Sequence, residues 1–281
     1  MTTLRYFVTG GWGRLRSGPL PDRARADAEL LLLHVLGKNR AWLLTHPDEE
    51  FAEDKATRYL ELLERRFIGE PIQYIIGETE FFGLTFRVTP DVLIPRPETE
   101  HLVEKVIELT AGFEQSRIVD VGTGSGAIAV ALASKLTQTS ITAIDISSRA
   151  LMIARENAIH NAVSLRFLEG DLLAPVAGEH FEIIASNPPY VPEIDRDALS
   201  VEVRDFEPAQ ALFAGDDGLE IYRRLIPAAF NALVPGGYLV LEIGYGQSAA
   251  IRGLLANSGF TQIEFVPDLQ GIPRVACARR P

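Results

Sequence analysis

The chain has 281 residues but only one cysteine, Cys277, so it forms no internal disulfide and no thiolate cage around a metal ion. Its five histidines are not spaced as the ligands of a zinc site, and we therefore expect no bound metal. The longest apolar run, Ala127 to Ala133, is too short to span a bilayer, and residues 1–13 lack the apolar core of a signal peptide. These absences predict a cytoplasmic protein without a membrane-spanning segment.

Basic residues are scarce relative to acidic ones. Lys and Arg number 27 against 38 Asp and Glu, which gives a formal net charge of −11 at pH 7. Because neutralising phosphates requires clustered Lys and Arg, this balance argues against a protein that coats duplex DNA or anionic membranes. Hydrophobic residues make up 47% and charged residues 23%, which is typical of a globular chain and excludes collagen and coiled coil. We expect a monomer with no direct nucleic-acid partner.

Apolar residues recur at helical spacing in the first seventy residues. One stripe begins after Pro21 and ends at Gly37, and its members are Ala28, Leu31, Leu32, Val35 and Leu36. A second stripe consists of Ala56, Leu60, Leu63 and Phe67. This pattern predicts a helical bundle over residues 1–75. Residues 81–88 then read as a hairpin around Gly83, within a linker that we place at residues 76–92.

From about Pro90, helix and strand patterns alternate. We expect a helix around residues 102–107 and further helices at 126–136, 148–160, 218–232 and 247–258. Strands are expected at 118–121, 140–144, 165–169, 181–185 and 237–243. Such alternation predicts a parallel sheet with helices on both faces. The last two strands, 261–266 and 274–279, are joined by a loop too short for a crossover and should pair antiparallel. Residues 93–281 are therefore predicted to form an α/β, Rossmann-like domain with a seven-stranded sheet and a terminal antiparallel hairpin.

A glycine-rich loop, Asp120-Val-Gly-Thr-Gly-Ser-Gly126, lies where a strand should give way to a helix. The glycines permit a tight turn and close approach of a ligand, and the helix start offers free N–H groups. Asp145 ends the next strand, where a carboxylate can bind a ribose diol, and Asp171 follows the third strand, where it would border an adenine ring. Together these residues predict an adenosine-containing cofactor. The loop also satisfies the dinucleotide fingerprint, so a nicotinamide-dependent dehydrogenase is an alternative.

The tetrapeptide Asn187-Pro-Pro-Tyr190 follows the strand predicted at 181–185. Two consecutive prolines fix the backbone and remove two N–H donors, so the polar groups left are mostly acceptors, namely the Asn187 side-chain oxygen and backbone carbonyls. Acceptors suit a substrate NH₂ group, and Tyr190 offers a flat surface for a planar amide or base. A merely rigid turn is the alternative, because Asn-Pro and Pro-Pro are common in turns.

The glycine loop, Asp145, Asn187–Tyr190 and the terminal hairpin together resemble the S-adenosylmethionine-dependent methyltransferases that modify planar amino or amide nitrogens. Further segments resemble the bacterial peptide chain release factor glutamine methyltransferases, the PrmC/HemK family. These segments are Gly69–Gly77, Ile94–Glu100, Glu207-Pro208 and Gly271–Val275. The resemblance covers nearly the whole chain, from about Asp27 to Arg279.

The resemblance implies methyl transfer from S-adenosyl-L-methionine to the glutamine side-chain amide in the Gly-Gly-Gln motif of class I release factors, which act in translation termination. It implies a cofactor site made of Gly122, Thr123, Gly124, Ser125, Gly126, Asp145, Asp171, Leu172 and Asn187. Catalytic roles fall to Asn187, Pro188 and Tyr190, and the substrate glutamine pocket to Asn187, Pro188, Pro189 and Tyr190. The N-terminal helices would help to recognise the release factor. Leu172 stands where some members carry an aromatic residue, so stacking on adenine is replaced there by apolar contact.

Other functions share parts of this pattern. A glutamine methyltransferase acting on a ribosomal protein would have the same fold and pocket. An adenine or cytosine amino-methyltransferase uses a similar tetrapeptide to hold a flipped base, but it needs a basic groove. The net charge of −11 argues against such a groove. A non-catalytic adenosine-binding module is a further alternative. The roles of Arg96, Glu98 and Glu100 stay open between an active-site cover and a helix cap, and the role of Glu242 is equally open.

Overall fold

The computed structural model describes residues 3–281 and divides into two compact units. The smaller unit contains the chain up to Gly77 together with a short distant segment, Leu199–Phe206. The larger unit contains Glu78–Ala198 and Glu207–Pro281. No helix within residues 3–281 is long and apolar enough to cross a membrane.

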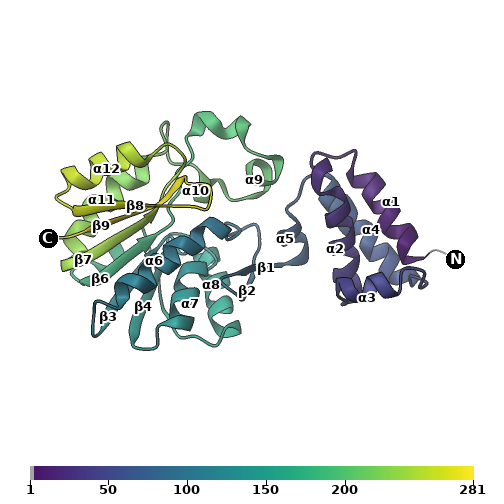
Figure 1. The fold of residues 1–281 in the computed structure, drawn as a ribbon, viewed down its shortest axis with the longest axis horizontal. Helices are drawn as coiled ribbons and strands as arrows, with labels where there is room; N and C mark the ends of the chain where they lie inside the picture. The colour runs from purple at the N-terminus through teal and green to yellow at the C-terminus, as the bar shows by residue number, and fades with distance from the viewer. Residues whose placement is uncertain (1–2) are drawn as a thin grey trace. The chain divides into compact units, whose positions relative to one another are not determined.

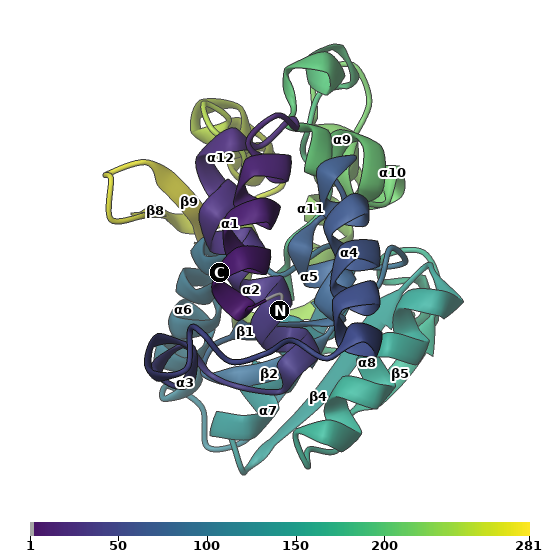
Figure 2. The same cartoon turned by 90° about the vertical axis from the view of Figure 1, so that its right-hand side faces the viewer.

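The smaller unit is helical. Its elements are α1 (Leu4–Leu15), η1 (Pro21–Arg23), α2 (Ala24–Leu36), α3 (Arg40–Thr45), α4 (Glu53–Phe67), α5 (Ile72–Ile76) and, from the distant segment, α9 (Val201–Phe206). Helices α1, α2 and α4 pack side by side (Figures 1 and 2). The two predicted stripes lie on α2 and α4, but the position assigned to Leu60 is wrong. Leu60 is 49% exposed, whereas its neighbour Tyr59 is fully buried and its hydroxyl donates to the Phe7 carbonyl.

A buried arginine holds the distant segment in the smaller unit. Arg66 of α4 donates from Nε to Asp27 Oδ2 of α2 and from Nη1 to Glu202 Oε1 of α9, each at 2.6 Å. Its side chain is only 1% exposed. The guanidinium neutralises the two carboxylates, and its Nε and Nη1 donors have partners that burial would otherwise deny them. Residues far apart in sequence are therefore joined into one helical body.

The predicted hairpin is present as β1 (Glu78–Phe81) and β2 (Leu84–Arg87), which pair antiparallel. Phe82 and Gly83 at its turn both have positive φ, the geometry that suits a two-residue hairpin loop. The hairpin packs into the larger unit, where Phe81 and Phe86 are buried in the hydrophobic core. The boundary between the two units therefore falls just before the hairpin, after Gly77.

Seven strands form the sheet of the larger unit, as predicted. They are β3 (Ser116–Val121), β4 (Thr139–Asp145), β5 (Arg166–Glu169), β6 (Phe181–Ser186), β7 (Leu233–Glu242), β8 (Thr261–Pro267) and β9 (Pro273–Arg279). Their order is β5-β4-β3-β6-β7-β9-β8. Strand β9 runs antiparallel to both β7 and β8, and the other neighbours are parallel. The predicted terminal antiparallel hairpin is thus confirmed.

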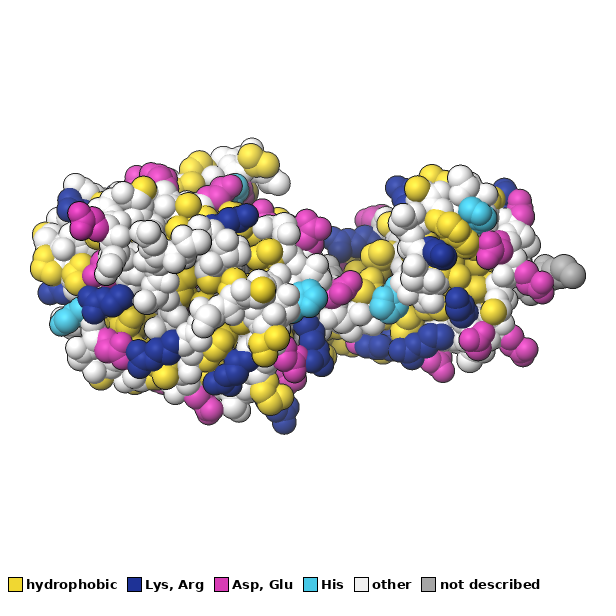
Figure 3. All heavy atoms as spheres, turned by 90° about the horizontal axis from the view of Figure 1, so that it is seen from below, with side chains coloured by type: hydrophobic (Ala, Val, Ile, Leu, Met, Phe, Trp, Pro, Cys, Tyr) yellow, Lys and Arg dark blue, Asp and Glu magenta, His cyan; other side chains and the backbone are white. Residues whose placement is uncertain are grey.

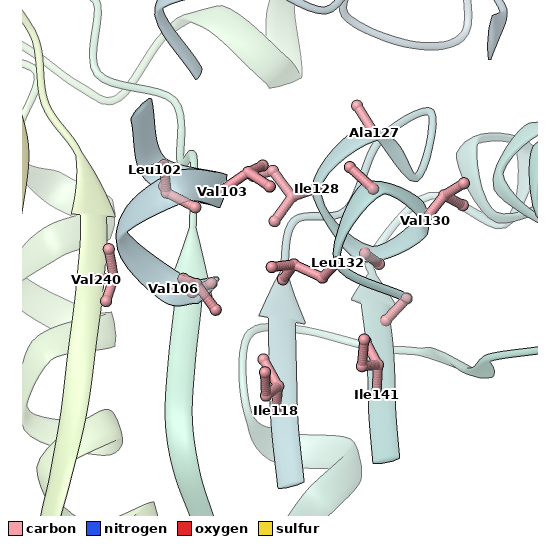
Figure 4. Close-up of a cluster of buried hydrophobic side chains, with 14 of the residues drawn as sticks. Leu102, Val103, Val106, Ile118, Ala127, Ile128, Val130, Leu132, Ile141 and Val240 are labelled. Carbon is pink, nitrogen blue, oxygen red and sulfur yellow. The ribbon is translucent and has the colours of Figure 1, made fainter. Parts of the chain in front are cut away.

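Helices cover both faces of the sheet (Figure 1). One face carries α6 (Glu100–Thr110), α7 (Ala127–Lys135) and α8 (Ser148–His160), and the other carries α11 (Glu220–Ala232) and α12 (Ser248–Asn257). Shorter helical turns are η2 (Pro97–Thr99), η3 (Ala174–Val176), η4 (Glu193–Ala198) and α10 (Ala209–Leu212). Successive strand residues point to opposite faces, so Ile183 enters one core and Ile184 the other. Figure 4 shows part of the first core, where Val106 of α6 and Leu132 of α7 belong to the same buried cluster as Ile118 of β3.

The chain order of the strands reverses beside β3. After β3 the chain builds β4 and β5 on one side, and it then returns to place β6 on the other. Ligands of open α/β sheets bind at such a switch point, beyond the carboxyl ends of the strands. The two strand ends are tied together because Ser186 Oγ donates to the Val121 carbonyl at 2.7 Å. The glycine loop and Asn187 both leave the sheet at this place.

Candidate active site

The glycine loop turns sharply after β3. Gly122, Gly124 and Gly126 all have positive φ, at 74°, 56° and 83°. A Cβ atom added to Gly122 or Gly124 would meet no atom within 4 Å, so both positions face open space. An added Cβ on Gly126 would instead lie 3.1 Å from the Ala154 Cβ, which makes this glycine a packing requirement between α7 and α8. The loop therefore has room for a ligand at its first two glycines.

Side chains of β3 and α8 hold the loop in shape. Thr123 Oγ1 donates to Asp120 Oδ2 at 2.6 Å, and the Ser125 carbonyl accepts from Asn157 Nδ2 at 2.8 Å. Asn157 is fully buried and also accepts from the Arg87 N–H of the hairpin. The sequence prediction did not include Asn157. The available signal was an asparagine on the side of the predicted helix 148–160 that also carries Ala154 and Ala158.

Burial perturbs the first acid of the loop. Asp120 is completely buried, and desolvation raises the pKa of its carboxyl to about 7 despite the hydrogen bond from Thr123. The nearby Asp145 carboxylate raises it further. Asp120 therefore supports the loop from within the core and is not positioned to contact a ligand.

Asp145 stands at the end of β4, next to the loop. Its Oδ2 accepts from the Gly124 N–H at 2.8 Å, and its Oδ1 accepts from the Ser147 N–H at 2.9 Å. Desolvation raises the pKa of this carboxyl, and the backbone donors oppose that rise. Because each carboxylate oxygen can accept more than one hydrogen bond, lone pairs stay available for a ribose diol. The structure thus brings the predicted Asp145 and glycine loop together.

Two further predicted cofactor residues, Asp171 and Leu172, lie further along the sheet. Asp171 follows β5 at the edge of the sheet and forms an ion pair with Arg224 of α11. Leu172 has a positive φ of 49° and is partly buried against the second core. Asp171 is therefore oriented by a partner on the helix that covers this face.

The Asn187–Tyr190 tetrapeptide leaves β6 beside the glycine loop. Asn187 Nδ2 donates to Thr99 Oγ1 at 3.2 Å, and Pro188 is buried. Tyr190 OH donates to Glu242 Oε1 at 3.3 Å, and its carbonyl accepts from Gln247 Nε2 at 3.0 Å. Both ends of the tetrapeptide are therefore held by side chains from other elements.

Both ends of the tetrapeptide are linked by hydrogen bonds to Glu242 at the end of β7: Tyr190 directly, and Asn187 through Thr99. Thr99 Oγ1 donates to Glu242 Oε2 at 2.5 Å, and the carboxyl is only 2% exposed. Desolvation raises its pKa to about 7, while the bonds from Thr99 and Tyr190 lower it. Burial also raises the pKa of the Tyr190 phenol, so it stays protonated at neutral pH. From the sequence, Thr99 is recognisable only as part of the Ile94–Glu100 segment, and the role of Glu242 is open between site and structure.

Two other residues of the 94–100 segment, Arg96 and Glu100, have separate partners. Arg96 Nη2 donates to Glu207 Oε1 at 2.5 Å, where Glu207 is nearly fully buried. Glu100 Oε1 accepts from the Phe82 N–H at 2.7 Å and so ties α6 to the hairpin turn. Within residues 3–281, no group of three or more His, Cys, Asp or Glu could hold a metal ion.

Comparisons with known proteins agree with this architecture. Residues 14–77 match the PrmC N-terminal domain, and residues 98–216 match the methyltransferase small domain. The chain is similar to the release factor glutamine methyltransferase of Koribacter versatilis, with 45% identity over 99% of both chains. It is 42% identical to that of Deinococcus radiodurans, over 99% of this chain and 98% of that protein.

A solved structure shares the fold. The Thermus thermophilus 16S rRNA N2 G1207 methyltransferase RsmC, in complex with AdoMet and guanosine, superposes with a TM-score of 0.55 at 18% identity. The match covers 73% of this chain and 50% of that one. Because this identity of 42–45% extends over nearly the whole chain and both domains match, the chain belongs to the release factor glutamine methyltransferase family.

Proposed function

We propose that this enzyme transfers a methyl group from S-adenosyl-L-methionine to the glutamine side-chain amide in the Gly-Gly-Gln motif of class I release factors. The observation that carries the proposal is the position of Asn187. It follows β6 at the switch point of the sheet, next to the glycine loop that follows β3. Its amide nitrogen is engaged by Thr99, so its amide oxygen is the group left to accept a hydrogen from a substrate.

The residues after β3 and β4 fit the proposed cofactor. Gly122 and Gly124 face open space with positive φ, and Asp145 is held next to them by the Gly124 N–H. We assign the adenosine part of the cofactor to residues 122–126 together with Asp145, Asp171 and Leu172. When bound, the cofactor supplies an electrophilic methyl group on its sulfonium sulfur.

The protein's own contribution is to orient a poor nucleophile. The lone pair of an amide nitrogen is delocalised into its carbonyl, and the site offers acceptors instead of a base. Asn187 Oδ1 and the Pro188 carbonyl would accept the two amide hydrogens, which orients the nitrogen and increases its electron density. Orientation of this kind can contribute about 7–11 kcal/mol, and dipoles that match the developing positive charge add to it. Pro189 and Tyr190 would form the wall against the planar amide.

We assign recognition of the release factor to the helical residues 1–75, with residues 76–92 as the connection and residues 93–281 as the methyltransferase domain. The enzyme would act as a monomer in the cytoplasm. The mixed charges on the protein surface make nucleic acid a poorer candidate substrate than a protein. Acidic side chains lie among the Lys and Arg side chains on the face shown in Figure 3, and Arg117 and Arg166 are paired with Glu182 and Glu179.

The test is a methylation reaction followed by peptide mapping. The protein is incubated with S-adenosylmethionine and an unmodified class I release factor, and the masses of the tryptic peptides are measured by mass spectrometry. We expect a gain of one methylene on the Gly-Gly-Gln glutamine, and none when that glutamine is replaced by alanine. Asn187→Ala should lower turnover by about 100-fold or more, while the exposed Asn231→Ala should not change it. A release factor that stays unmethylated while a ribosomal protein gains the group would overturn the proposal.

A further inference from the structure

A chain of hydrogen bonds runs from the buried end of β7 to Asn187. Glu242 Oε2 accepts from Thr99 Oγ1 at 2.5 Å, and Thr99 Oγ1 accepts from Asn187 Nδ2 at 3.2 Å. The second carboxylate oxygen, Oε1, accepts from Tyr190 OH at 3.3 Å. Glu242 therefore connects to both ends of the Asn187–Tyr190 tetrapeptide.

The chemistry of these groups determines which one donates and which one accepts in each hydrogen bond. An ionised carboxylate carries no hydrogen, so Thr99 must use its only hydroxyl hydrogen to reach Glu242. The Thr99 oxygen then offers only lone pairs to Asn187. A carboxamide in the opposite orientation would place its oxygen against the Thr99 oxygen, with no hydrogen between them. The end of Asn187 that faces Thr99 is therefore its NH₂ group.

Burial makes this preference strong. Thr99 is 4% exposed and Glu242 is 2% exposed, so water cannot readily replace either partner. The Glu242 backbone is fixed as well, because its carbonyl accepts from Tyr222 OH of α11 at 2.7 Å. The position of the carboxylate is therefore also fixed by contacts outside the tetrapeptide.

We propose that Thr99 and Glu242 are positioning residues that select one orientation of the Asn187 carboxamide, with its oxygen directed to the substrate amide. This inference rests on the proposed function of Asn187 as the acceptor of a substrate hydrogen. A flipped Asn187 would present a donor to the substrate NH₂ group and would repel it. Neither Thr99 nor Glu242 needs to touch the substrate for this effect.

Thr99→Val is the main test because valine keeps the shape of threonine but has no hydroxyl. We expect kcat to fall by about 100-fold, while the KM for S-adenosylmethionine changes less than about threefold. Thr99→Ser keeps the hydroxyl and should restore most of the loss. The matched control is Thr110→Val in α6, where the hydroxyl only donates to the Val106 carbonyl. This control should turn over like the wild type.

Glu242→Gln tests the other end of the chain. Thr99 and Tyr190 donate to different oxygens of Glu242, and glutamine replaces one of these oxygens by an NH₂ group, so one of the two hydroxyls then faces a donor. We expect kcat to fall at least about tenfold. Thermal melting of each variant shows whether it is folded, and a folded Glu242→Gln variant decides the question if Thr99→Val is unstable.

A direct readout of Asn187 separates this proposal from the proposed function. The ¹H–¹⁵N signals of the Asn187 NH₂ group, assigned by their loss in Asn187→Ala, should shift and exchange faster with solvent in Thr99→Val. They should stay in place in Thr99→Ser and Thr110→Val. Unchanged Asn187 signals or wild-type kcat in a folded Thr99→Val variant would overturn the positioning role. Failure of the wild type to methylate any release factor would overturn the proposed function alone, since the NMR comparison does not depend on turnover.

Discussion

The backbone N–H of Gly124 donates a hydrogen bond of 2.8 Å to Asp145 Oδ2, and this bond joins the loop after β3 to the end of β4. The other oxygen of Asp145 accepts from the Ser147 N–H, so the carboxylate has a defined orientation before any ligand arrives. Preorganisation of this kind lowers the entropy cost of binding. The glycine loop and the carboxylate thus act as one preformed surface.

Gly124→Ala should abolish cofactor binding at little cost in folding. The new methyl group would point into the open space that we assign to the ligand, and the positive φ should cost about 1 kcal/mol of stability. Gly37→Ala is the matched control, because Gly37 also has a positive φ and no atom within 4 Å of an added Cβ, but it caps α2 in the smaller unit. Calorimetric titration and thermal melting should show similar melting losses, with binding lost only in Gly124→Ala. Equal binding in both variants would contradict the assigned site.

Asp120→Asn should stabilise the unliganded protein more at high pH than at low pH. The folded-state pKa of Asp120 is about 7, above its usual value of 3.8, so the folded protein keeps a proton that the unfolded chain loses between these values. The stability contribution of the protonated carboxyl is complete below pH 3.8 and is lost as pH rises through 7. Asparagine keeps the acceptor for Thr123 and does not ionise. Melting at pH 5.5 and pH 8 should give a larger gain for the variant at pH 8, and a gain independent of pH would refute the raised pKa.

Turnover should rise with pH through the titration of Glu242. Its pKa is raised to about 7, and only the ionised carboxylate accepts from both Thr99 and Tyr190. The titratable groups that face it are Glu98, Tyr190, Tyr222 and Arg274. Of these, Glu98 raises its pKa and Arg274 lowers it. We expect kcat measured from pH 6 to pH 8.5 to have a midpoint near 7, and Glu242→Gln to have a flatter profile. The same midpoint in that variant would assign the titration to another group.

Arg66→Ala should destabilise the smaller unit strongly. It would leave the buried Asp27 carboxylate and the partly buried Glu202 carboxylate without their cation, at a cost of about 3–5 kcal/mol. Arg58→Ala on the same helix removes only an exposed pair with Glu61 and should cost less than about 1 kcal/mol. Urea unfolding followed by circular dichroism gives both values. Comparable losses in the two variants would show that the buried cluster does not stabilise the unit.

Much of the fold was predictable because its signals are local. Strand runs such as Ile118–Val121 and the glycine loop after them have a periodicity and backbone chemistry that do not depend on distant contacts. The α1 helix was not predicted as a separate element, and its sequence explains this. It contains three glycines, which disfavour an isolated helix, yet Gly11 packs so closely on Tyr59 that an added Cβ would lie 2.0 Å from the hydroxyl.

The residues that we propose to contact a ligand could be inferred from the sequence, whereas the residues that hold them in place could not. Asn187, Asp145 and the glycine loop lie in short motifs at strand ends, so their chemistry and location could be inferred together. Thr99 and Glu242 are separated by 143 positions, and Asp27 and Glu202 lie on different parts of the chain. Polar groups such as these acquire defined partners only when packing removes water around them. The sequence alone therefore determined the chemistry offered at the strand ends, and the tertiary structure decided the orientation of Asn187 and the attachment of residues 199–206 to the helical unit.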